Sequence, residues 1–472
     1  MNYVSTRGQV EPLEFQQAVM MGLADDGGLL IPEHIPDVRD RLDAWGALDY
    51  PALAGAVLRL FTTDMPADDL DRLIEASYGE TFEPDVAPVV RVGELFVLEL
   101  WHGPTMSFKD VALQLLGNLF EYILARGGGR MNILGATSGD TGSAAICGAR
   151  GRDGIDIFMM HPAGRVSPIQ ARQMTTVLDD NVHNIAVEGS FDDCQRIMKT
   201  LAGDLDFKRR YALGAVNSVN WARVLAQIVY YFKAAFDVQR ATGAERVRVC
   251  VPTGNFGNIL AAWYAVQMGA PISRLILATN ENDILARFFN TGQYALGSVH
   301  ETLAPAMDIQ VASNFERYLY YKLDGDDRRL QARMAEFSRT GSLMVEPERP
   351  GGGPDPLFEA GAATRDDILA AIRRCHDQYG YLIDPHTACG YSVVTSLVPA
   401  GVGEAGGPDD TEPTVVVATA HPAKFPDAIR EATGADIARH PQIDALADKP
   451  TRCVTLDNDI EAVRKFIIDT VG

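Results

Sequence analysis

Short runs of β-favouring residues alternate with longer helical patterns along most of this chain, and this alternation constrains its fold more than any other feature. The run LFVLEL at residues 95–100 precedes a helical pattern from Val111, and MNIL at residues 131–134 precedes another near Ser143. RVRVCV at residues 246–251 leads in the same way into NILAAWYAV. Strands that alternate with helices usually lie parallel, so the sequence predicts an α/β fold on parallel sheets. A length of 472 residues with 47% hydrophobic content implies more than one domain.

The first ninety residues have a different pattern. They are helix-rich and are interrupted by the turn-prone strings ADDGGLLIP at residues 24–32 and YGETFEP at residues 78–84, which predicts a separate amino-terminal region over residues 1–90. Residues 314–337 are charged and helix-like, which predicts an inserted helical part. A Gly/Pro-rich segment near Pro399 is predicted to be a surface loop.

The composition excludes several classes of partner. The net charge of −21 argues against nucleic acid or an anionic membrane, so an anionic substrate must be attracted by a local site. No segment approaches a membrane-spanning length, the start MNYVSTRGQVEPLEF lacks the apolar stretch of a signal peptide, and a cytoplasmic location is expected. The cysteines are scattered without a CxxC pair and are interpreted as reduced thiols: Cys147, Cys194, Cys250, Cys375, Cys389 and Cys453.

Lys109 is the first candidate for catalysis. It is the last residue but one of the string HGPTMSFKD at residues 102–110, and it stands where a strand-like run gives way to a helical pattern. The positive end of a helix and partial burial both disfavour the ammonium form, so a free amine able to form a Schiff base becomes accessible near neutral pH. The alternative is a surface lysine that begins a helix.

Two Gly-rich loops follow other strand-like runs, at the position where open α/β sheets bind ligands. GATSGDTGSAA at residues 135–145 can present backbone N–H groups to an anion, or can be a simple turn with a helix cap. PTGNFGN at residues 252–258 lets the backbone approach a phosphate closely at Gly254 and Gly257. Neither loop matches the Walker or dinucleotide pattern, so the second loop favours a mononucleotide-like phosphate such as that of a vitamin cofactor.

A fourth motif, ATAHPAKF at residues 418–425, follows the strand-like run VVVA. Thr419 is expected at the end of that strand as a hydroxyl partner, with Lys424 as a charge on the same rim. Histidines lie in or beside these motifs, but their spacings match no metal-binding pattern, so no metal is predicted. They are His102, His161, His386 and His421.

Taken together, these strings resemble threonine synthases, pyridoxal-phosphate (PLP) enzymes of fold type II. Further strings occur in the matching order: YVSTRG at residue 3, DDGGLLIP at 25, GRVSPIQ at 164, NSVNWARVLAQ at 217, SNFERYLY at 313 and DPHTACGY at 384. The resemblance covers nearly the whole chain. It implies an α/β fold with two open parallel-sheet domains, an amino-terminal helix-rich region and a helical insertion at about residues 314–375. The large PLP-binding domain would span residues 91–127 and 225–472, and the small domain residues 128–224.

The resemblance also implies roles for single residues. Lys109 would be the Schiff-base lysine and Thr419 the partner of the cofactor's pyridine nitrogen, where a neutral hydroxyl tempers the electron sink. The cofactor phosphate would be held by Gly254, Asn255, Phe256, Gly257 and Asn258. The substrate carboxylate would be held by Ser138, Gly139, Asp140 and Thr141. Relatives often carry asparagine in place of Asp140, so a contact from its side chain to the cofactor hydroxyl is not implied.

The implied reaction converts O-phospho-L-homoserine and water into L-threonine and phosphate, through γ-elimination and then β-addition of water. It needs a second anion site for the substrate phosphate, distinct from the site of the cofactor phosphate. Arginine and amide side chains are candidates for this second site, because their N–H groups suit a phosphoryl group. The candidates are Arg165, Asn217, Asn220, Arg223 and Lys424. Two alternatives stay open: a related phospho-lyase that releases a 2-oxo acid, and a non-catalytic sensor of an amino-acid phosphate. A monomer or homodimer is expected.

Overall fold

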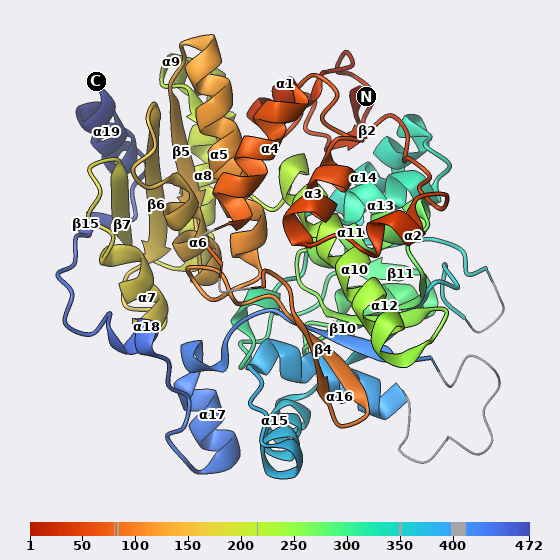
Figure 1. Cartoon of the computed structure of the whole chain (residues 1–472). Coiled ribbons are helices and arrows are strands. Elements are labelled where there is room, and N and C mark those ends of the chain that lie inside the picture. Colours follow the sequence, from red (N-terminus) through yellow and green to blue (C-terminus); the bar gives the residue numbers. More distant parts are fainter. Residues whose placement is uncertain (80, 83–84, 215, 349–351, 398–411) are drawn as a thin grey trace.

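Two mostly parallel sheets lie side by side in the computed structural model, which describes residues 1–472 except 80, 83–84, 215, 349–351 and 398–411 (Figure 1). The larger sheet has the strand order β13-β10-β9-β14-β4-β3, and only the β3–β4 pair is antiparallel. Its strands are β3 (Val89–Val92), β4 (Leu95–Glu99), β9 (Val247–Pro252), β10 (Ile272–Thr279), β13 (Phe358–Ala362) and β14 (Thr414–Ala418). Residues of β9 and β14 are buried throughout, as expected of parallel strands covered on both faces.

The smaller sheet is parallel throughout, with the strand order β15-β7-β6-β5-β8. Its strands are β5 (Met131–Ala136), β6 (Ile155–Pro162), β7 (Val182–Glu188), β8 (Leu213–Gly214) and β15 (Val454–Asp457). The prediction of an α/β fold on parallel sheets is therefore confirmed.

The C-terminal end of the chain differs from the expected division, which assigned residues 225–472 to the large domain. β15 pairs with β7, and α19 (Ile460–Val471) places Val463 and Ile467 in the apolar cluster of the smaller sheet. Figure 1 places both elements beside β7, far from β4 and β10. β15 pairs with the open edge of β7, and α19 packs its apolar face against β15 and α8 (Phe191–Gly203), a long-range arrangement that local sequence patterns do not reveal.

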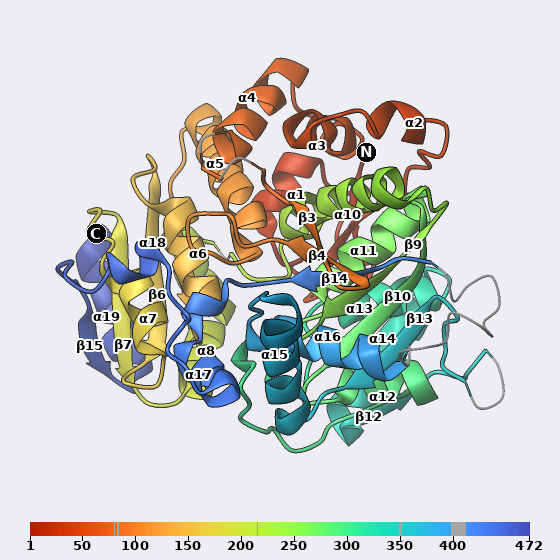
Figure 2. The same cartoon turned by 60° about the horizontal axis from the view of Figure 1, so that its bottom comes forward.

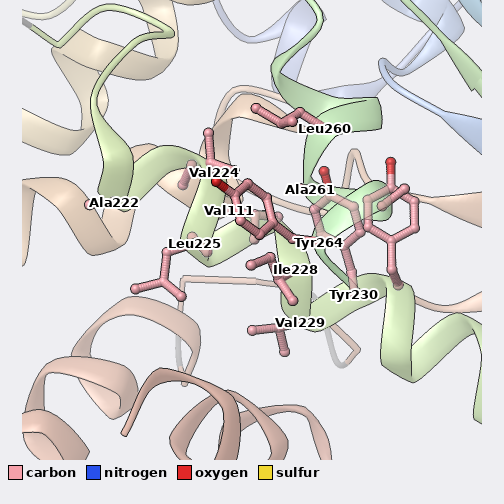
Figure 3. Close-up of a cluster of buried hydrophobic side chains, with 14 of the residues drawn as sticks. Val111, Ala222, Val224, Leu225, Ile228, Val229, Tyr230, Leu260, Ala261 and Tyr264 are labelled. Carbon is pink, nitrogen blue, oxygen red and sulfur yellow. The ribbon is translucent and has the colours of Figure 1, made fainter. Parts of the chain in front are cut away.

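Three long helices pack on one another. They are α5 (Lys109–Gly127), α10 (Trp221–Thr242) and α11 (Gly257–Met268), with α10 in contact with both of the others. Their buried side chains form the largest core, and Figure 3 shows Val111, Leu225, Tyr230 and Tyr264 from these helices among one another. None of the described helices is both long and apolar enough to cross a membrane.

The amino-terminal region packs on the same core. It contains β1 (Tyr3–Ser5), α1 (Phe15–Met21), β2 (Leu30–Pro32), α2 (Leu42–Trp45), α3 (Tyr50–Leu58) and α4 (Ala67–Tyr78). The ring centroid of Tyr3 lies 5.9 Å from that of Trp221, and the guanidinium of Arg317 donates to the carbonyl of Leu30. Figure 2 shows these helices over α10, so the region is helix-rich as predicted but shares its core with the rest of the chain.

The helical insertion is shorter than predicted. Helices α13 (Phe315–Lys322) and α14 (Asp327–Thr340) occupy its first half, but β13 lies inside the predicted range and pairs with β10 in the larger sheet. The string FEAGA of β13 contains no β-branched residue, which explains why the pattern did not indicate a strand. The predicted loop near Pro399 lies outside the described residues.

The other described elements are shorter or peripheral. They are α6 (Asp140–Ala149), α7 (Pro168–Thr175), α8 (Phe191–Gly203), α9 (Leu205–Arg210), α12 (Ile284–Thr291), β11 (Gln293–Ala295), η1 (Pro305–Met307), β12 (Ser342–Met344), α15 (Arg365–Tyr379), α16 (Pro385–Leu397), η4 (Pro422–Lys424), α17 (Pro426–Thr433) and α18 (Pro441–Asp444).

Candidate active site

The loops that follow β4, β14 and β9 meet at the carboxyl ends of the parallel strands of the larger sheet, because these three strands are neighbours. The N–H of Phe108 donates to the carbonyl of Thr419 at 2.9 Å, and Ser107 forms an antiparallel bridge with Ala420. The residue before Lys109 is thus bonded to Thr419. The sequence predicted that the Lys109 loop and the Thr419 motif each follow the end of a strand, and this hydrogen bond links the two motifs.

Lys109 is the first residue of α5 and is buried. Burial lowers the pKa of Lys109; the carboxylate of Asp140 opposes this effect, while Lys424 and Arg223 add to it. The Nζ atom lies 3.7 Å from Oδ2 of Asp140 and 5.0 Å from the ring centroid of Phe108. A buried amine with a lowered pKa at the start of a helix has the features of a nucleophile.

Asp140 connects the two sheets electrostatically. It begins α6, beside the smaller sheet, and its Oδ1 lies 2.8 Å from Nζ of Lys424 in η4, after the last strand of the larger sheet. Nε2 of Gln170 also donates to Oδ1, at 2.7 Å. Burial alone would raise the pKa of Asp140, but Lys424 and Lys109 outweigh burial and hold that pKa well below its usual range. The carboxylate is therefore ionised and shared by two buried lysines.

The loop after β9 has the strained backbone of a ligand cradle. Phe256 has a φ of 65°, a left-handed conformation that is uncommon for a residue with a side chain, and its ring stacks on that of Phe289 at 5.8 Å. The carbonyl of Asn255 accepts from the backbone and side-chain N–H groups of Asn314, at 3.1 and 3.2 Å. These contacts fix the conformation of the loop just before α11.

Several buried donors around this edge have no partner among the described residues. They are the hydroxyl Oγ of Ser107, Nε of Arg223 and Nδ2 of Asn258. Leaving a buried donor unpaired costs about 1–3 kcal/mol, so such groups commonly face a ligand. A group with several acceptor oxygens, such as a phosphate ester, fits this set of donors.

The small loop at residues 137–142 uses some of its donors internally. Oγ1 of Thr137 accepts from the N–H groups of Gly139 and Gly142, at 3.0 and 2.9 Å. Ser138 is exposed and Thr141 half-buried, so their hydroxyl groups stay available. Asp140, which belongs to this loop, brings the loop next to Lys109. This position is compatible with the predicted role of the loop in binding the substrate carboxylate.

The predicted residues of the second anion site have different surroundings. Lys424 is 1% exposed and donates from Nζ to the carbonyl of Thr105 at 2.7 Å. Arg223 is buried and donates to the carbonyl of Val216, and burial lowers its pKa to about 10. Asn217 is half-buried and Arg165 is exposed.

Asn220 has a structural role in the described chain. Its Oδ1 accepts from the N–H of Ala222 at 3.1 Å, as the N-cap of α10, and its Nδ2 donates to the carbonyl of Val19 at 2.9 Å. Because both ends of the amide have partners, Asn220 is a poorer candidate for the substrate phosphate than the sequence suggested.

Sequence reasoning missed three residues near the site. Gln170 donates a hydrogen bond to the carboxylate of Asp140, and Asp384 and His386 form a buried pair. Nδ1 of His386 lies 2.7 Å from Oδ2 of Asp384, and its Nε2 accepts from the N–H of Ala306 at 3.3 Å. The strings GRVSPIQ and DPHTACGY contain these residues. In the sequence they only supported the resemblance to threonine synthases and indicated no role for a single residue.

The other histidines have local partners. Nε2 of His102 lies 2.8 Å from Oε2 of Glu99, and the ring of His421 lies 4.8 Å from that of Trp101. Burial, with a further effect of His440, lowers the pKa of His421 to about 4, so this imidazole is neutral at pH 7. Within the described part of the chain, no cluster of three or more His, Cys, Asp or Glu side chains could hold a metal ion.

Three family models match consecutive parts of the chain. Residues 2–78 match the threonine synthase N terminus, residues 85–349 the pyridoxal-phosphate-dependent enzymes and residues 387–467 the threonine synthase C-terminal part. The threonine synthase of Pseudomonas aeruginosa is 44% identical over 99% of this chain and 98% of its own length. A human protein described as threonine synthase-like 2 is 36% identical over 99% of this chain and 97% of its own.

Solved structures agree with these matches. A PLP-bound threonine synthase from Brucella melitensis has a TM-score of 0.92 and 43% identity, and covers 100% of this chain and 99% of its own. The yeast threonine synthase has a TM-score of 0.92 and 38% identity, with 100% and 98% coverage. The predicted fold type and cofactor class are confirmed by these matches. With its buried lysine, its cradle loop and these relatives, the chain belongs to the threonine synthase family of pyridoxal-phosphate-dependent enzymes.

Proposed function

We propose that the chain converts O-phospho-L-homoserine and water into L-threonine and phosphate. The observation that carries this proposal is the buried Lys109, which lies 3.7 Å from Asp140 at the edge where the loops of three neighbouring strands meet. The 44% identity to a threonine synthase over nearly the full chain supports the same reaction.

The residues around Lys109 fit pyridoxal phosphate. In the proposal, Lys109 would hold the cofactor covalently through Nζ, residues 254–258 would hold its phosphate, and the hydroxyl of Thr419 would serve its ring nitrogen. The buried Nδ2 of Asn258 is a hydrogen-bond donor without a partner among the described residues, and it suits an oxygen of the cofactor phosphate. When bound, the cofactor supplies an electron sink for the negative charge that develops beside the amino group of the substrate.

Lys109 also moves protons in the proposed reaction. Burial lowers the pKa of Nζ and so favours the neutral amine, which would take up the α proton and then a β proton of the bound substrate. The phosphate leaves from the γ carbon, and water adds at the β carbon. The carboxylate of Asp140 stabilises Nζ each time it carries a proton, since the two groups are only 3.7 Å apart.

The substrate needs two anion sites in addition to the cradle of the cofactor. We assign its carboxylate to Ser138, Gly139 and Thr141, and its phosphate to Lys424 and Arg223, with Asn217 and Arg165 at the outer side. Lys424 and Arg223 are the buried cations of the predicted set, and burial strengthens an ion pair because water screens it less. Asp140 then acts mainly as the counter-charge of the two lysines.

The proposed domain division follows the two sheets. The large unit comprises residues 91–127 and 225–450, and the small unit comprises residues 128–224 together with β15 and α19. The substrate would bind between them, where Asp140 of one unit contacts Lys109 and Lys424 of the other. The cytoplasmic location and the monomeric or homodimeric state remain predictions.

The test of the function is a product analysis. Wild-type protein with PLP and O-phospho-L-homoserine is expected to release inorganic phosphate and L-threonine in equal amounts. Phosphate with 2-oxobutyrate instead would indicate a phospho-lyase, and tight binding of the substrate without either product would indicate a sensor. The three outcomes exclude one another.

Gly254→Ala is expected to weaken cofactor binding. A Cβ atom at this position would lie 2.7 Å from the carbonyl oxygen of Ala306, so the cradle loop must shift. Overpacking of this kind costs about 1–3 kcal/mol, which corresponds to roughly a tenfold or larger rise in the PLP dissociation constant. Titration of the apoenzyme with PLP measures it. Gly203→Ala is the control, since a Cβ there meets nothing within 4 Å.

The rate of cofactor loading is expected to reach its half-maximum at a lower pH than for an ordinary lysine amine, whose pKa is about 10.4. Only the neutral amine of Lys109 attacks the aldehyde, and its fraction rises with pH through its lowered pKa. Stopped-flow absorbance of apoenzyme mixed with PLP at several pH values gives the pH profile of the rate. The reference is lysine amide acetylated at its α-amino group, which keeps a free side-chain amine. An identical midpoint for protein and reference would contradict the lowered pKa.

A further inference from the structure

Two adjacent tyrosines of α10 hold the side chain of Asn258, a residue of the cradle loop. The hydroxyl of Tyr231 donates to Oδ1 of Asn258 at 2.7 Å, and the hydroxyl of Tyr230 donates to the same oxygen. Both tyrosines are completely buried, and the ring of Tyr230 is packed among apolar residues of α10 and α11 (Figure 3). From the sequence this pair was interpreted as helix packing.

The two phenols fix which way the amide of Asn258 points. Burial raises the pKa of both tyrosines well above their usual range, so each hydroxyl keeps its proton and remains a donor. An amide oxygen has two lone pairs, and here both are occupied. The amide nitrogen Nδ2 must therefore lie on the other side, where it is buried and has no partner in the described part of the chain.

The position of Asn258 indicates what that nitrogen meets. Asn258 is the last residue of the cradle loop at residues 254–258 and the second residue of α11. The positive end of a helix favours phosphate. If the amide were rotated by half a turn, its oxygen would face the phosphate and repel it. We propose that Tyr230 and Tyr231 are positioning residues that hold Asn258 with Nδ2 directed at the cofactor phosphate. This inference rests on the proposed cofactor site.

The proposal predicts a non-additive loss of cofactor affinity. One remaining phenol still selects the same orientation, so Tyr230→Phe and Tyr231→Phe should each raise the PLP dissociation constant by no more than about threefold. The double variant frees the amide to rotate and should raise it by about tenfold or more. Tyr264→Phe is the matched control, because Tyr264 lies on a later turn of α11 and its hydroxyl donates to Tyr321 of α13 and not to Asn258.

The experiment is a PLP titration of the apoenzymes by absorbance, repeated with pyridoxal, which lacks the phosphate. A positioning role predicts that the double variant loses affinity for PLP but not for pyridoxal, and that the tyrosine changes have no further effect in an Asn258→Ala background. Equal losses for both ligands, the same loss in the Asn258→Ala background, or an unchanged PLP affinity would each overturn the proposal. If the double variant does not fold, the single variants in the Asn258→Ala background give the same comparison. The readout is binding, so it is independent of the product that the enzyme forms.

Discussion

Lys109→Ala is expected to lower the rate of threonine formation by at least about 10³-fold, because a single change removes both the amine that binds the cofactor and the group that moves protons. The measurement is phosphate and L-threonine released from O-phospho-L-homoserine, with the visible absorption band of the bound cofactor recorded in the same sample. Lys109→Arg should lose as much, since a guanidinium keeps the positive charge but is not a usable nucleophile.

The control for this prediction is Lys465→Ala. Lys465 lies on the surface of α19, with a side chain 74% exposed and paired only with Asp469. Its loss should leave the rate unchanged within about twofold, because exposed ion pairs contribute little. A Lys109→Ala protein that retains the absorption band and more than a tenth of the wild-type rate would exclude the proposed role.

Asp140→Asn is expected to lower the free energy of unfolding by about 3 kcal/mol or more, because it leaves Lys424 buried without a counter-charge. Asparagine keeps the shape and still accepts from Gln170, so the change isolates the charge. Urea unfolding at pH 7.5 gives the difference. Activity should fall as well, since Nζ of Lys109 loses the carboxylate 3.7 Å away.

The effect of Asp140 should depend on pH in a defined direction. A carboxyl whose folded pKa is depressed stabilises the fold above its unfolded pKa of about 3.9, and this stabilisation is lost as the pH falls through the folded pKa. The difference between wild type and Asp140→Asn should thus be constant near neutral pH and shrink only in strong acid. Lys424→Met added to Asp140→Asn should restore part of the stability, because it removes the unpaired charge.

A surface pair on α19 again serves as the reference. Asp469→Asn breaks the exposed pair with Lys465 and should change the free energy of unfolding by less than about 1 kcal/mol. A loss of that small size for Asp140→Asn would mean that Lys424 is neutral in the folded protein, and the electrostatic account of the site would fail.

The sequence predicted those parts of the site that depend on local pattern. Lys109, Thr419 and the loop after β9 each follow a strand-like run, and adjacent parallel strands bring such ends to one edge. The pairing of Asp140 with Lys424 could not be predicted this way, because Asp140 follows a strand of the smaller sheet and Lys424 follows a strand of the larger sheet. Nor could the roles of Tyr230 and Tyr231, since a buried tyrosine has the same helical spacing whether its hydroxyl is used or not.

The fold could be predicted to a similar depth. Alternating strands and helices indicate parallel sheets, but not which sheet a short polar strand joins. VTLD of β15 contains only exposed or half-buried residues, so its own composition carries no burial signal. β13 was missed for a related reason, as its glycine and alanine residues pack closely without favouring a strand.

The return of β15 and α19 to the smaller sheet has a consequence for biosynthesis. β15 and α19 leave the ribosome later than the other strands of the smaller sheet, so that sheet stays incomplete, with the edge of β7 unpaired, until they have emerged. All of the larger sheet's strands precede them in the chain and can assemble first. A chain in which residues 453–472 are missing would therefore carry a complete larger sheet beside an open strand edge that favours association with other chains.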